Sequence, residues 1–306
     1  MWEDREDSLA CVHEAWIIKT IIEFAILIVI IVIAYKFYKS NDFNNFTSNI
    51  RSLTGDLATT IADASNQINV IVEVIDDADA AFEIVSIALH NGKAVVSASK
   101  KMIAEHLPEI LQMQKETDLP FLCEAAACAS IPVIRNLEEY YDNDLLHSIK
   151  AIVNGSTNFI LTKMFEDKLD FNAALLLAKQ LGFAESNPKL DVEGYDAVNK
   201  WAILLNHAYG IVEHPDNILF TGIQNIQLTD ALVAKEKGLD IKLIAQAKKL
   251  KNGKVAAFVL PQFVQNGDPL SFVKNEYNGV VIESGFADKQ FFYGKGAGSF
   301  PTASAV

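Results

Sequence analysis

The sequence predicts an α/β protein with two domains behind an apolar N-terminal segment. Strand-like and helix-like stretches alternate from Asn69 onward, which is typical of parallel β-α-β units. After residue 144, longer helical patterns mix with further strands, which indicates a second domain. The chain has 306 residues, of which 50% are hydrophobic, so it is long enough to bury a sizeable core in two domains.

Charge and cysteine content narrow the classes of protein that fit the sequence. The formal net charge is −13, which argues against a nucleic-acid partner because phosphate binding needs a basic surface. The three cysteines, Cys11, Cys123 and Cys128, are odd in number and widely scattered. They predict no disulfide framework and indicate a reducing compartment.

The apolar segment within residues 1–40 allows three interpretations. Phe24–Tyr35 reads FAILIVIIVIAY, and its 12 residues are short for a membrane-spanning helix of about 20. Extending the helix over residues 16–38 reaches that length only by including Lys19, Glu23 and Lys36. Such a membrane anchor has acidic residues before it and basic residues after it, which places the rest of the chain on the cytoplasmic side. The alternatives are a buried strand or helix of a soluble core, and a gene-level replacement of another segment.

Residues 41–135 are expected to form a parallel sheet with helical connections, after a polar linker at 41–66. NVIVEV, from Asn69, is the nearly continuous apolar run of a strand buried on both faces. DAAFEIVSIALH has helical spacing, and AVVSAS, a helix through Ile110–Lys115 and the strand PFLCEA follow it. Ligands of such sheets sit beyond the carboxyl ends of the strands, where Ser97–Lys101 falls.

The second domain is expected over Asp144–Ala297. Long helices are predicted around Ala173–Leu181 and Asp196–Tyr209, and KVAAFVL is a predicted strand. The segment contains no internal repeat.

The stretch Glu185–Lys200, ESNPKLDVEGYDAVNK, combines four carboxylates with a terminal lysine. Asp196 and Lys200 are four residues apart, so they share a face of the predicted helix. Such a pair is most often an exposed ion pair worth roughly a few tenths of a kcal/mol. The alternative is a site in which the acids bind one cation and the lysine handles one proton.

Three further stretches carry weaker signals. NGSTNFIL (Asn154–Leu161) leads from a small-residue turn into a helix, which can bind an anion or can be N-capped by Ser156 or Thr157. GKGAGS (Gly294–Ser299) lets a backbone approach a ligand closely. It is expected to lack the preceding strand, following helix and downstream acid of a dinucleotide fingerprint. Lys100, at a strand end, is either a solvated lysine or one that faces a ligand.

The order of these stretches resembles homoserine dehydrogenases. VVSASKK, CEAAACASIPVIRNL, GSTNFILTKM, LGFAESNPKLDVEGYDAVNKWAIL and GKGAGSFPTASAV follow one another as in that family, from roughly Asn69 to Val306. The resemblance implies reduction of L-aspartate 4-semialdehyde to L-homoserine, a step of threonine and methionine biosynthesis, with NADPH or NADH. It implies a homodimer that acts on a small amino-acid substrate.

The resemblance also completes the predicted fold class. The protein is expected to be α/β, with an incomplete Rossmann-like parallel sheet at 41–135 and an N-terminal hydrophobic helix. An α+β substrate and dimerisation domain is expected at 136–290, and the chain returns to the nucleotide domain at 291–306.

Individual catalytic and substrate-binding residues are carried over from the resemblance. Lys200 matches the proton donor, Asp196 lies beside it, and Lys100 matches a lysine near the nicotinamide and the substrate. Glu185, Asp191 and Asp196 match acids of the substrate pocket. Hydride attack on an aldehyde develops negative charge on oxygen, which a protonated lysine stabilises and then neutralises with its proton.

Cofactor and cation sites are implied in the same way. The cofactor-binding positions are Lys100, Gly182, Gly296 and Gly298. A monovalent-cation site, with Na+ as the expected ion, matches four residues that offer one carboxylate and three backbone carbonyl groups: Glu124, Ala127, Ala129 and Ile131.

The sequence departs from the family in the cofactor half. Residues 1–50 contain no GxGxxG-type phosphate loop, and the chain stops at Val306, where the family continues into a returning helix. Ser99 replaces the usual Asn, and Ala125 and Ala129 stand where glycine is often found. The alternative function is therefore that of a catalytically impaired homologue, acting as a binding or scaffold subunit, or a truncated gene product. A membrane-tethered amino-acid sensor is a third interpretation.

Overall fold

A computed structural model describes residues 69–141 and 145–306 of the chain. Every described residue belongs to one compact unit, which spans residues 61–306. The hydrophobic segment at 1–40, its anchor helix over 16–38 and the linker at 41–66 lie outside the described residues. Within the described ranges, no helix has both the length and the apolar character needed to cross a membrane.

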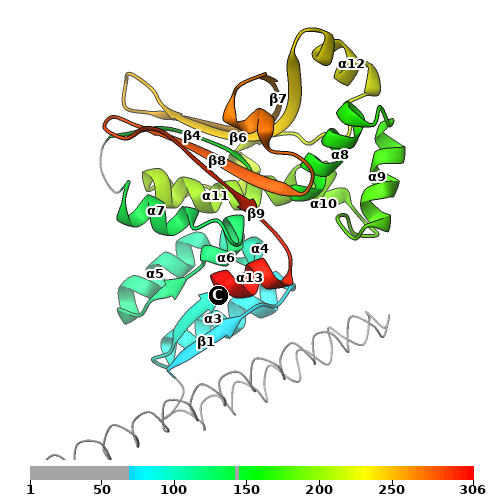
Figure 1. Cartoon of the computed structure of the whole chain (residues 1–306). Helices are drawn as coiled ribbons and strands as arrows, with labels where there is room; N and C mark the ends of the chain where they lie inside the picture. Colours follow the sequence, from blue (N-terminus) through cyan, green and yellow to red (C-terminus); the bar gives the residue numbers. More distant parts are fainter. Residues whose placement is uncertain (1–68, 142–144) are drawn as a thin grey trace, which may run out of the picture. The chain divides into compact units, whose positions relative to one another are not determined.

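The predicted parallel sheet is confirmed. It has three strands in the order β1 (Val70–Glu73), β2 (Ala94–Ser97) and β3 (Phe121–Leu122), all parallel (Figure 1). The connections are helical, through α3 (Ala78–His90), α4 (Lys100–Glu105) and α5 (Leu107–Thr117). Asp77 is the N-cap of α3: its side chain accepts a hydrogen bond from the amide of Ala80, which has no partner within the helix.

Burial of β1 differs from the prediction. Ile71 and Ile75 pack against the hydrophobic core, but Val70 and Val74 on the opposite face are 50% and 40% exposed. The expectation of a strand buried on both faces was therefore wrong for the described residues. The physical reason is that α3 and the core pack against the face of Ile71 and Ile75, and β1 is an edge strand of the described sheet.

A second, larger sheet follows. Its six strands lie in the order β5 (Leu219–Phe220), β7 (Val255–Gln265), β6 (Leu239–Lys249), β4 (Leu146–Ile152), β8 (Tyr277–Ser284) and β9 (Asp288–Lys295). Neighbouring strands are antiparallel, except that β5 and β7 are parallel. The longest pairing joins β6 and β7, whose hairpin turns at Gly253 with φ 80°.

Helices contact this sheet or flank the helices that do (Figure 1). They are α8 (Gly155–Glu166), α9 (Phe171–Gln180), α10 (Lys189–Val192), α11 (Tyr195–Tyr209) and α12 (Leu228–Glu236), with short 3-10 turns η1 (Pro215–Asn217) and η2 (Pro269–Phe272). Of these helices, α8, α11 and α12 contact the sheet. The helices predicted around Ala173–Leu181 and Asp196–Tyr209 are confirmed as α9 and α11, and KVAAFVL as β7.

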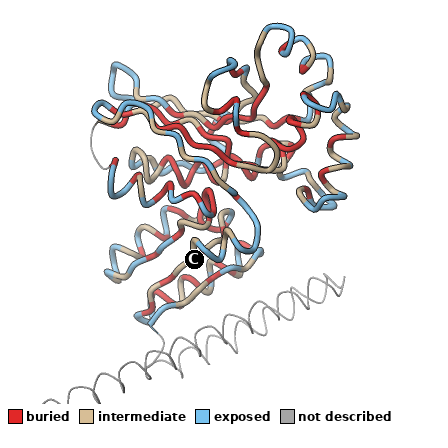
Figure 2. The backbone as a smooth tube through the Cα atoms, in the orientation of Figure 1, coloured by how far each residue is buried: buried red, intermediate tan, exposed pale blue. Residues whose placement is uncertain are grey.

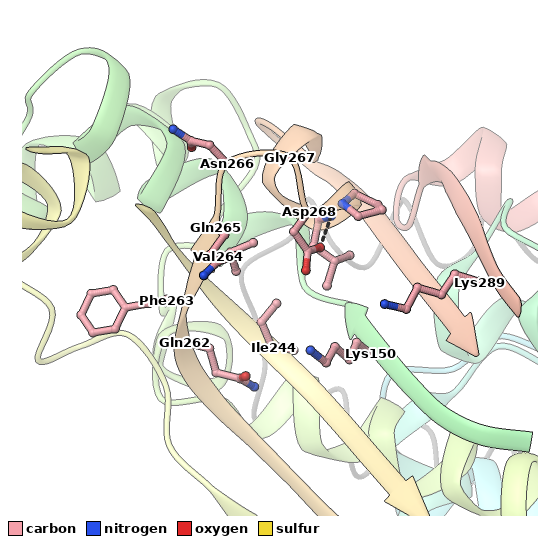
Figure 3. Close-up of a pocket in the computed structure, with 12 residues that line it drawn as sticks. Lys150, Ile244, Gln262, Phe263, Val264, Gln265, Asn266, Gly267, Asp268 and Lys289 are labelled. Carbon is pink, nitrogen blue, oxygen red and sulfur yellow. Dashed lines mark hydrogen bonds between the residues drawn. The ribbon is translucent and has the colours of Figure 1, made fainter. Parts of the chain in front are cut away.

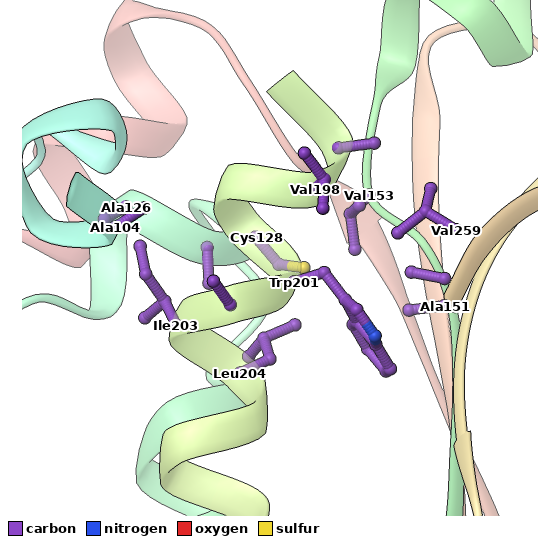
Figure 4. Close-up of a cluster of buried hydrophobic side chains, with 14 of the residues drawn as sticks. Ala104, Ala126, Cys128, Ala151, Val153, Val198, Trp201, Ile203, Leu204 and Val259 are labelled. Carbon is purple, nitrogen blue, oxygen red and sulfur yellow. The ribbon is translucent and has the colours of Figure 1, made fainter. Parts of the chain in front are cut away.

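The two sheets share one core. Helix α11 contacts α4, α6 (Glu124–Cys128) and α7 (Val133–Glu139), and it also touches β6 and β7. Trp201 of α11 is fully buried at the centre of this contact, between Cys128 on one side and Ala151 of the larger sheet on the other (Figure 4). Buried residues from all of these elements belong to one hydrophobic cluster (Figure 2). The domain boundaries predicted at 135 and 290 stay predictions, because the core crosses them.

Candidate active site

The pair Asp196 and Lys200 is buried, which corrects the expectation of an exposed ion pair. Lys200 Nζ lies 2.8 Å from Asp196 Oδ2 across one turn of α11, and each side chain is 8% exposed. Helix α11 starts after Gly194, whose φ of 95° is open to glycine, so Asp196 falls in its first turn. Helical spacing places both side chains on one face, but α4 and α6 cover that face, so the charges lie in the interior.

A second lysine meets the same carboxylate. Lys100 Nζ lies 3.2 Å from Asp196 Oδ1, so the two oxygens of one carboxylate hold two ammonium groups. Lys100 is the first residue of α4, and its side chain is 44% exposed, so it is not the freely solvated lysine of the simpler interpretation. Lys200 also donates to the carbonyl oxygen of Val153 at 2.9 Å, at the end of β4. Both sheets therefore contribute to one charged cluster.

Asn154 joins this cluster and was not singled out from the sequence. Its Oδ1 accepts from the amide of Thr157 at 2.8 Å, so Asn154 is the N-cap of α8 and the predicted caps Ser156 and Thr157 are wrong. Its Nδ2 donates to Asp191 Oδ1 at 2.7 Å and to Asp196 Oδ2 at 2.8 Å. The signal was available, because an asparagine stands at the start of the small-residue turn that leads into the helix.

The predicted acids act on one another electrostatically. Burial, followed by the charge of Asp196, raises the pKa of Asp191. Glu185 is exposed, and its pKa is raised by partial desolvation and then by the charges of Asp76 and Asp191. Asp76, which follows β1, was also missed by sequence reasoning. Negative charge therefore accumulates beside the lysines, an arrangement suited to binding a cationic group.

Asp196 stays ionised against the cost of burial. Burial alone would raise the pKa of its carboxyl group, but the charges of Lys200 and Lys100 outweigh burial and lower it. The charge of Asp196 in turn raises the pKa of Lys100. The carboxylate thus keeps at least Lys100 protonated as a cation, and it fixes the positions of both ammonium groups.

Two glycines allow the turn between α10 and α11 to pack closely against its neighbour. The turn between α10 and α11 lies flat against the turn after β5, where Gly194 and Gly222 face each other. A Cβ at Gly222 would stand 1.9 Å from the carbonyl oxygen of Val192, and Ile223 donates to that same oxygen at 2.7 Å. Only glycine fits at position 222, because the obstacle is backbone.

The glycine stretch Gly294–Ser299 has a different context from the expected one. Strand β9 precedes it and helix α13 (Ser299–Ala305) follows it, so the expectation that strand and helix are lacking was wrong. Strand β9 is nevertheless antiparallel to its neighbour, unlike a dinucleotide fingerprint. A Cβ at Gly296 would stand 1.8 Å from Asn278 Nδ2, so packing accounts for that glycine, while Gly298 has φ 114°.

At the remaining positions predicted for a cofactor or cation, the backbone and side chains make hydrogen bonds of helix ends and turns. Gly182 has φ 79° and ends α9 with hydrogen bonds typical of a glycine helix terminus, with open space beside it. Glu124 accepts from the amides of Ile134 and Arg135 at 3.0 and 2.8 Å, so its two oxygens cap α7. The carbonyl oxygen of Ile131 accepts from Val133. The roles of these residues toward a cofactor or Na+ stay predictions.

Fit to a nicotinamide cofactor is partial among the described residues. Lys100 stands at the carboxyl ends of the parallel strands, where ligands of such sheets bind. The turns that follow β1, β2 and β3 contain no glycine, so none of them is a pyrophosphate loop. These turns therefore offer no site for a pyrophosphate, and the role of Lys100 beside a nicotinamide stays a prediction.

A cavity elsewhere contains none of the predicted site residues. Its volume is about 650 Å³, and it lies between the larger sheet and the turn before η2. Figure 3 shows Lys150, Ile244 and Gln262 from three neighbouring strands on its wall. Asp268, Lys150 and Lys289 also line it, but no ion pair joins them among the described residues, so the chemistry considered above lies with the buried charges.

Comparisons with known proteins agree with the geometry. A family model described as "Homoserine dehydrogenase" matches residues 132–306. Homoserine dehydrogenases of Lactococcus lactis and Corynebacterium glutamicum are 35% and 38% identical, covering 79% and 78% of this chain and 56% and 55% of each relative. The chain thus spans a little over half the length of these relatives.

Solved structures give the same result. A homoserine dehydrogenase from Thiobacillus denitrificans superposes with a TM-score of 0.78 at 32% identity, covering 84% of this chain and 61% of that one. A hyperthermophilic archaeal homoserine dehydrogenase mutant, solved in complex with NADPH, has a TM-score of 0.65 at 32% identity. That alignment covers 78% of this chain and 68% of the archaeal one.

Proposed function

Because the chain belongs to the homoserine dehydrogenase family, we propose that it reduces L-aspartate 4-semialdehyde to L-homoserine, with NADPH or NADH as cofactor. The observation that carries the proposal is the buried carboxylate of Asp196 with Lys100 and Lys200 on its two oxygens. An ammonium group held in this way is a proton donor in a place where water is scarce.

Lys200 has the role of proton donor in this proposal. A bound nicotinamide would supply a hydride to the aldehyde carbon, and the carbonyl electron pair would then move onto oxygen. The ammonium of Lys200 stabilises this developing charge and transfers one proton to it, which gives the alcohol. The carbonyl oxygen of Val153 and the carboxylate of Asp196 fix the direction of the ammonium. In the reverse direction, a neutral lysine accepts the proton of the alcohol.

Glu185 and Asp191 have the role of binding the substrate ammonium group. Asp191 is held by the side-chain amide of Asn154, which also holds Asp196. The raised pKa values of Glu185 and Asp191 reflect crowding of negative charge, which a bound cation would relieve. Substrate and carboxylates therefore complement each other in charge.

Cofactor, cation and assembly complete the proposal. Lys100 would lie beside the nicotinamide, with Gly182, Gly296 and Gly298 nearby. The archaeal relative with NADPH supports the use of NADP. Na+ at Glu124, Ala127, Ala129 and Ile131 rests on the family resemblance alone.

A homodimer through the larger sheet is supported by exposed aromatic residues. Phe291 and Tyr293 of β9 are 40% and 51% exposed and lie on one face of that sheet. Sedimentation equilibrium measures the mass of the assembly. The mass of a monomer at micromolar concentration would contradict the dimer.

The decisive experiment measures homoserine-dependent reduction of NAD+ and NADP+ by the purified chain. Turnover with at least one cofactor is expected, and Lys200→Ala should lower it by about 10²–10⁴-fold. Lys101→Ala is the matched control, because the one ion pair of Lys101 among the described residues is with the partly exposed Glu105. Homoserine binding without turnover with either cofactor would refute the enzymatic proposal.

A further inference from the structure

Glu73 is a buried carboxylate that the proposed chemistry does not use. It ends β1 and is 2% exposed, and no ion pair to it occurs among the residues that the structure describes. Burial raises its pKa, against the effect of hydrogen bonds from Ser97 and Ile75. A carboxylate buried without a cation destabilises a fold unless its hydrogen bonds are satisfied. An apolar residue would cost less free energy at this strand position, so the hydrogen bonds of Glu73 must offset the cost of burying it.

The partners of Glu73 lie on the turn that leads to Lys100. The hydroxyl of Ser97 donates to Glu73 Oε2, and the amide of Ile75 donates to Oε1. The same Ser97 oxygen accepts from the amide of Ser99 at 3.1 Å. The amide of Ala98 donates to the backbone carbonyl of Glu73 at 3.0 Å. One side chain therefore ties the carboxyl ends of two neighbouring strands together.

The start of α4 has no side-chain cap among the described residues. Ser99 occupies the N-cap position of α4, but its own side chain makes no capping hydrogen bond. Lys100 follows immediately, and its side chain must reach Asp196 at 3.2 Å while it stays 44% exposed. A half-exposed lysine holds one direction only if its backbone is fixed. The amide of Lys100 donates to the carbonyl oxygen of Ala98 at 3.0 Å, and the Glu73–Ser97 contact adds a side-chain link beside this backbone bond.

We propose that Glu73 is a positioning residue that acts through Ser97 to hold the ammonium group of Lys100 against Asp196. Glu73 touches neither the proposed substrate-binding acids nor Lys200 in any described contact. The kinetic consequence rests on the proposed function, whereas the position of Lys100 does not. Two experiments therefore separate the two proposals.

The first experiment needs no turnover. Amine labelling with acetic anhydride at pH 8, followed by fragmentation mass spectrometry, gives the Lys100 to Lys101 ratio of acetylation. Only the neutral amine reacts, and an ion pair raises the pKa of a lysine. The fraction of neutral amine, and with it the acetylation rate, falls about tenfold for each unit by which the pKa rises. Glu73→Gln and Ser97→Ala should each raise the ratio by roughly three- to tenfold. Glu109→Gln, at an exposed acid on α5, should leave it unchanged.

An unchanged ratio in both variants would overturn the proposal. Ser97→Ala keeps the buried carboxylate, so it answers the question even if Glu73→Gln folds poorly. A raised ratio in a chain that shows no turnover would support the positioning role and refute the proposed function.

The second experiment uses the enzyme reaction. Glu73→Gln should lower kcat for homoserine oxidation several-fold, and it should have no further effect in a Lys100→Ala background. This non-additivity is the signature of one residue acting through another. A merely structural role would lower kcat by the same factor in both backgrounds, and that result would overturn the proposal.

Discussion

The two sheets of this molecule differ in how well the described residues complete them. In the parallel-sheet region (residues 69–128), the strands have 4, 4 and 2 residues, and Val70 is half exposed. In the mixed-sheet region (residues 145–295), β6 and β7 have 11 residues each, and Val259 is fully buried. The acids proposed to bind substrate and Lys200 stand on the mixed-sheet region, while Lys100 stands on the parallel-sheet region. The difference shows that the site depends on contacts that join the regions, and the ion pair of Asp196 with Lys100 is the one that lies within the charged cluster.

The largest effect is expected from breaking that junction. Asp196→Asn leaves two lysines without their shared carboxylate, one of them buried. We expect turnover to fall by about 10²–10⁴-fold and the free energy of unfolding to fall by roughly 3–5 kcal/mol. Steady-state kinetics and urea unfolding measure the two effects. Glu193→Gln is the control, since Glu193 pairs with the exposed Lys189 at 3.9 Å and should change both quantities little. If Asp196→Asn changed them no more than Glu193→Gln does, the regions would hold together without the carboxylate.

A pH-dependent effect should arise inside the mixed-sheet region. Lys242 on β6 is 2% exposed and donates to Asn158 Oδ1 at 3.0 Å and to the carbonyl oxygen of Val273. Burial, aided by the charge of Lys274, lowers its pKa from 10.5 to about 7. Between these values the unfolded chain binds a proton that the folded chain does not, so the free energy of unfolding rises with pH. Below about pH 7 both states are protonated and the rise is absent.

Urea unfolding at pH 6.5, 8 and 9.5 tests this expectation. The wild type should gain roughly a few kcal/mol across that range relative to Lys242→Met. Lys248→Met removes an exposed lysine on the same face of β6 and should keep the gain. Parallel pH curves for the wild type and Lys242→Met would contradict the assigned burial.

A smaller effect separates capping from substrate binding. Asn154→Ala should cost about 0.5–2 kcal/mol as a lost N-cap, and it should also raise KM for homoserine because Asp191 and Asp196 lose a shared donor. Asp170→Ala is the matched control, since Asp170 caps α9 through the amide of Ala173 at 2.8 Å and contacts none of the site residues. Equal KM values in the two variants would mean that Asn154 only caps α8.

The smallest effect concerns strain between the regions. Ala129 follows α6 with φ 44° and ψ −108°, a conformation that favours glycine. Ala129→Gly should raise the free energy of unfolding by about 1 kcal/mol, after the entropy cost of glycine is subtracted. Ala125→Gly, inside α6, should lower it by a similar amount. Thermal unfolding compares the two, and a loss of stability in both would argue that the Ala129 conformation carries no strain.

Local patterns predicted most of the elements. Alternation of apolar runs and helical spacing identified β1, α3 and β2, and the periodicity of residues 196–209 identified α11. Burial of the Asp196–Lys200 pair was not predictable in the same way, because spacing within a helix gives a face and not what covers it. The covering groups come from α4 and from Val153, which is 47 residues away from Lys200. Exposure of Val70 was missed for the same reason, since an apolar run does not state how many faces are covered.

Some residues of the site could be found from the sequence, and others could not. Lys100, Lys200 and Asp191 were found through the family resemblance, and the structure brings them together around Asp196. Glu73 was hidden within an apolar run, although a lone acid at a strand end is itself a signal. Glycine patterns were the least specific, because packing accounts for Gly296 and a helix terminus accounts for Gly182.

The contact between the two glycine turns bears on which natural variants can survive. Position 222 has no chemistry to perform, yet any methyl group there would displace the carbonyl of Val192 and with it the neighbouring Asp191. In a saturation mutagenesis screen under selection for homoserine synthesis, position 222 should tolerate as few substitutions as position 200, although glycine has no reactive group. A geneticist who ranked positions by reactivity alone would overlook it.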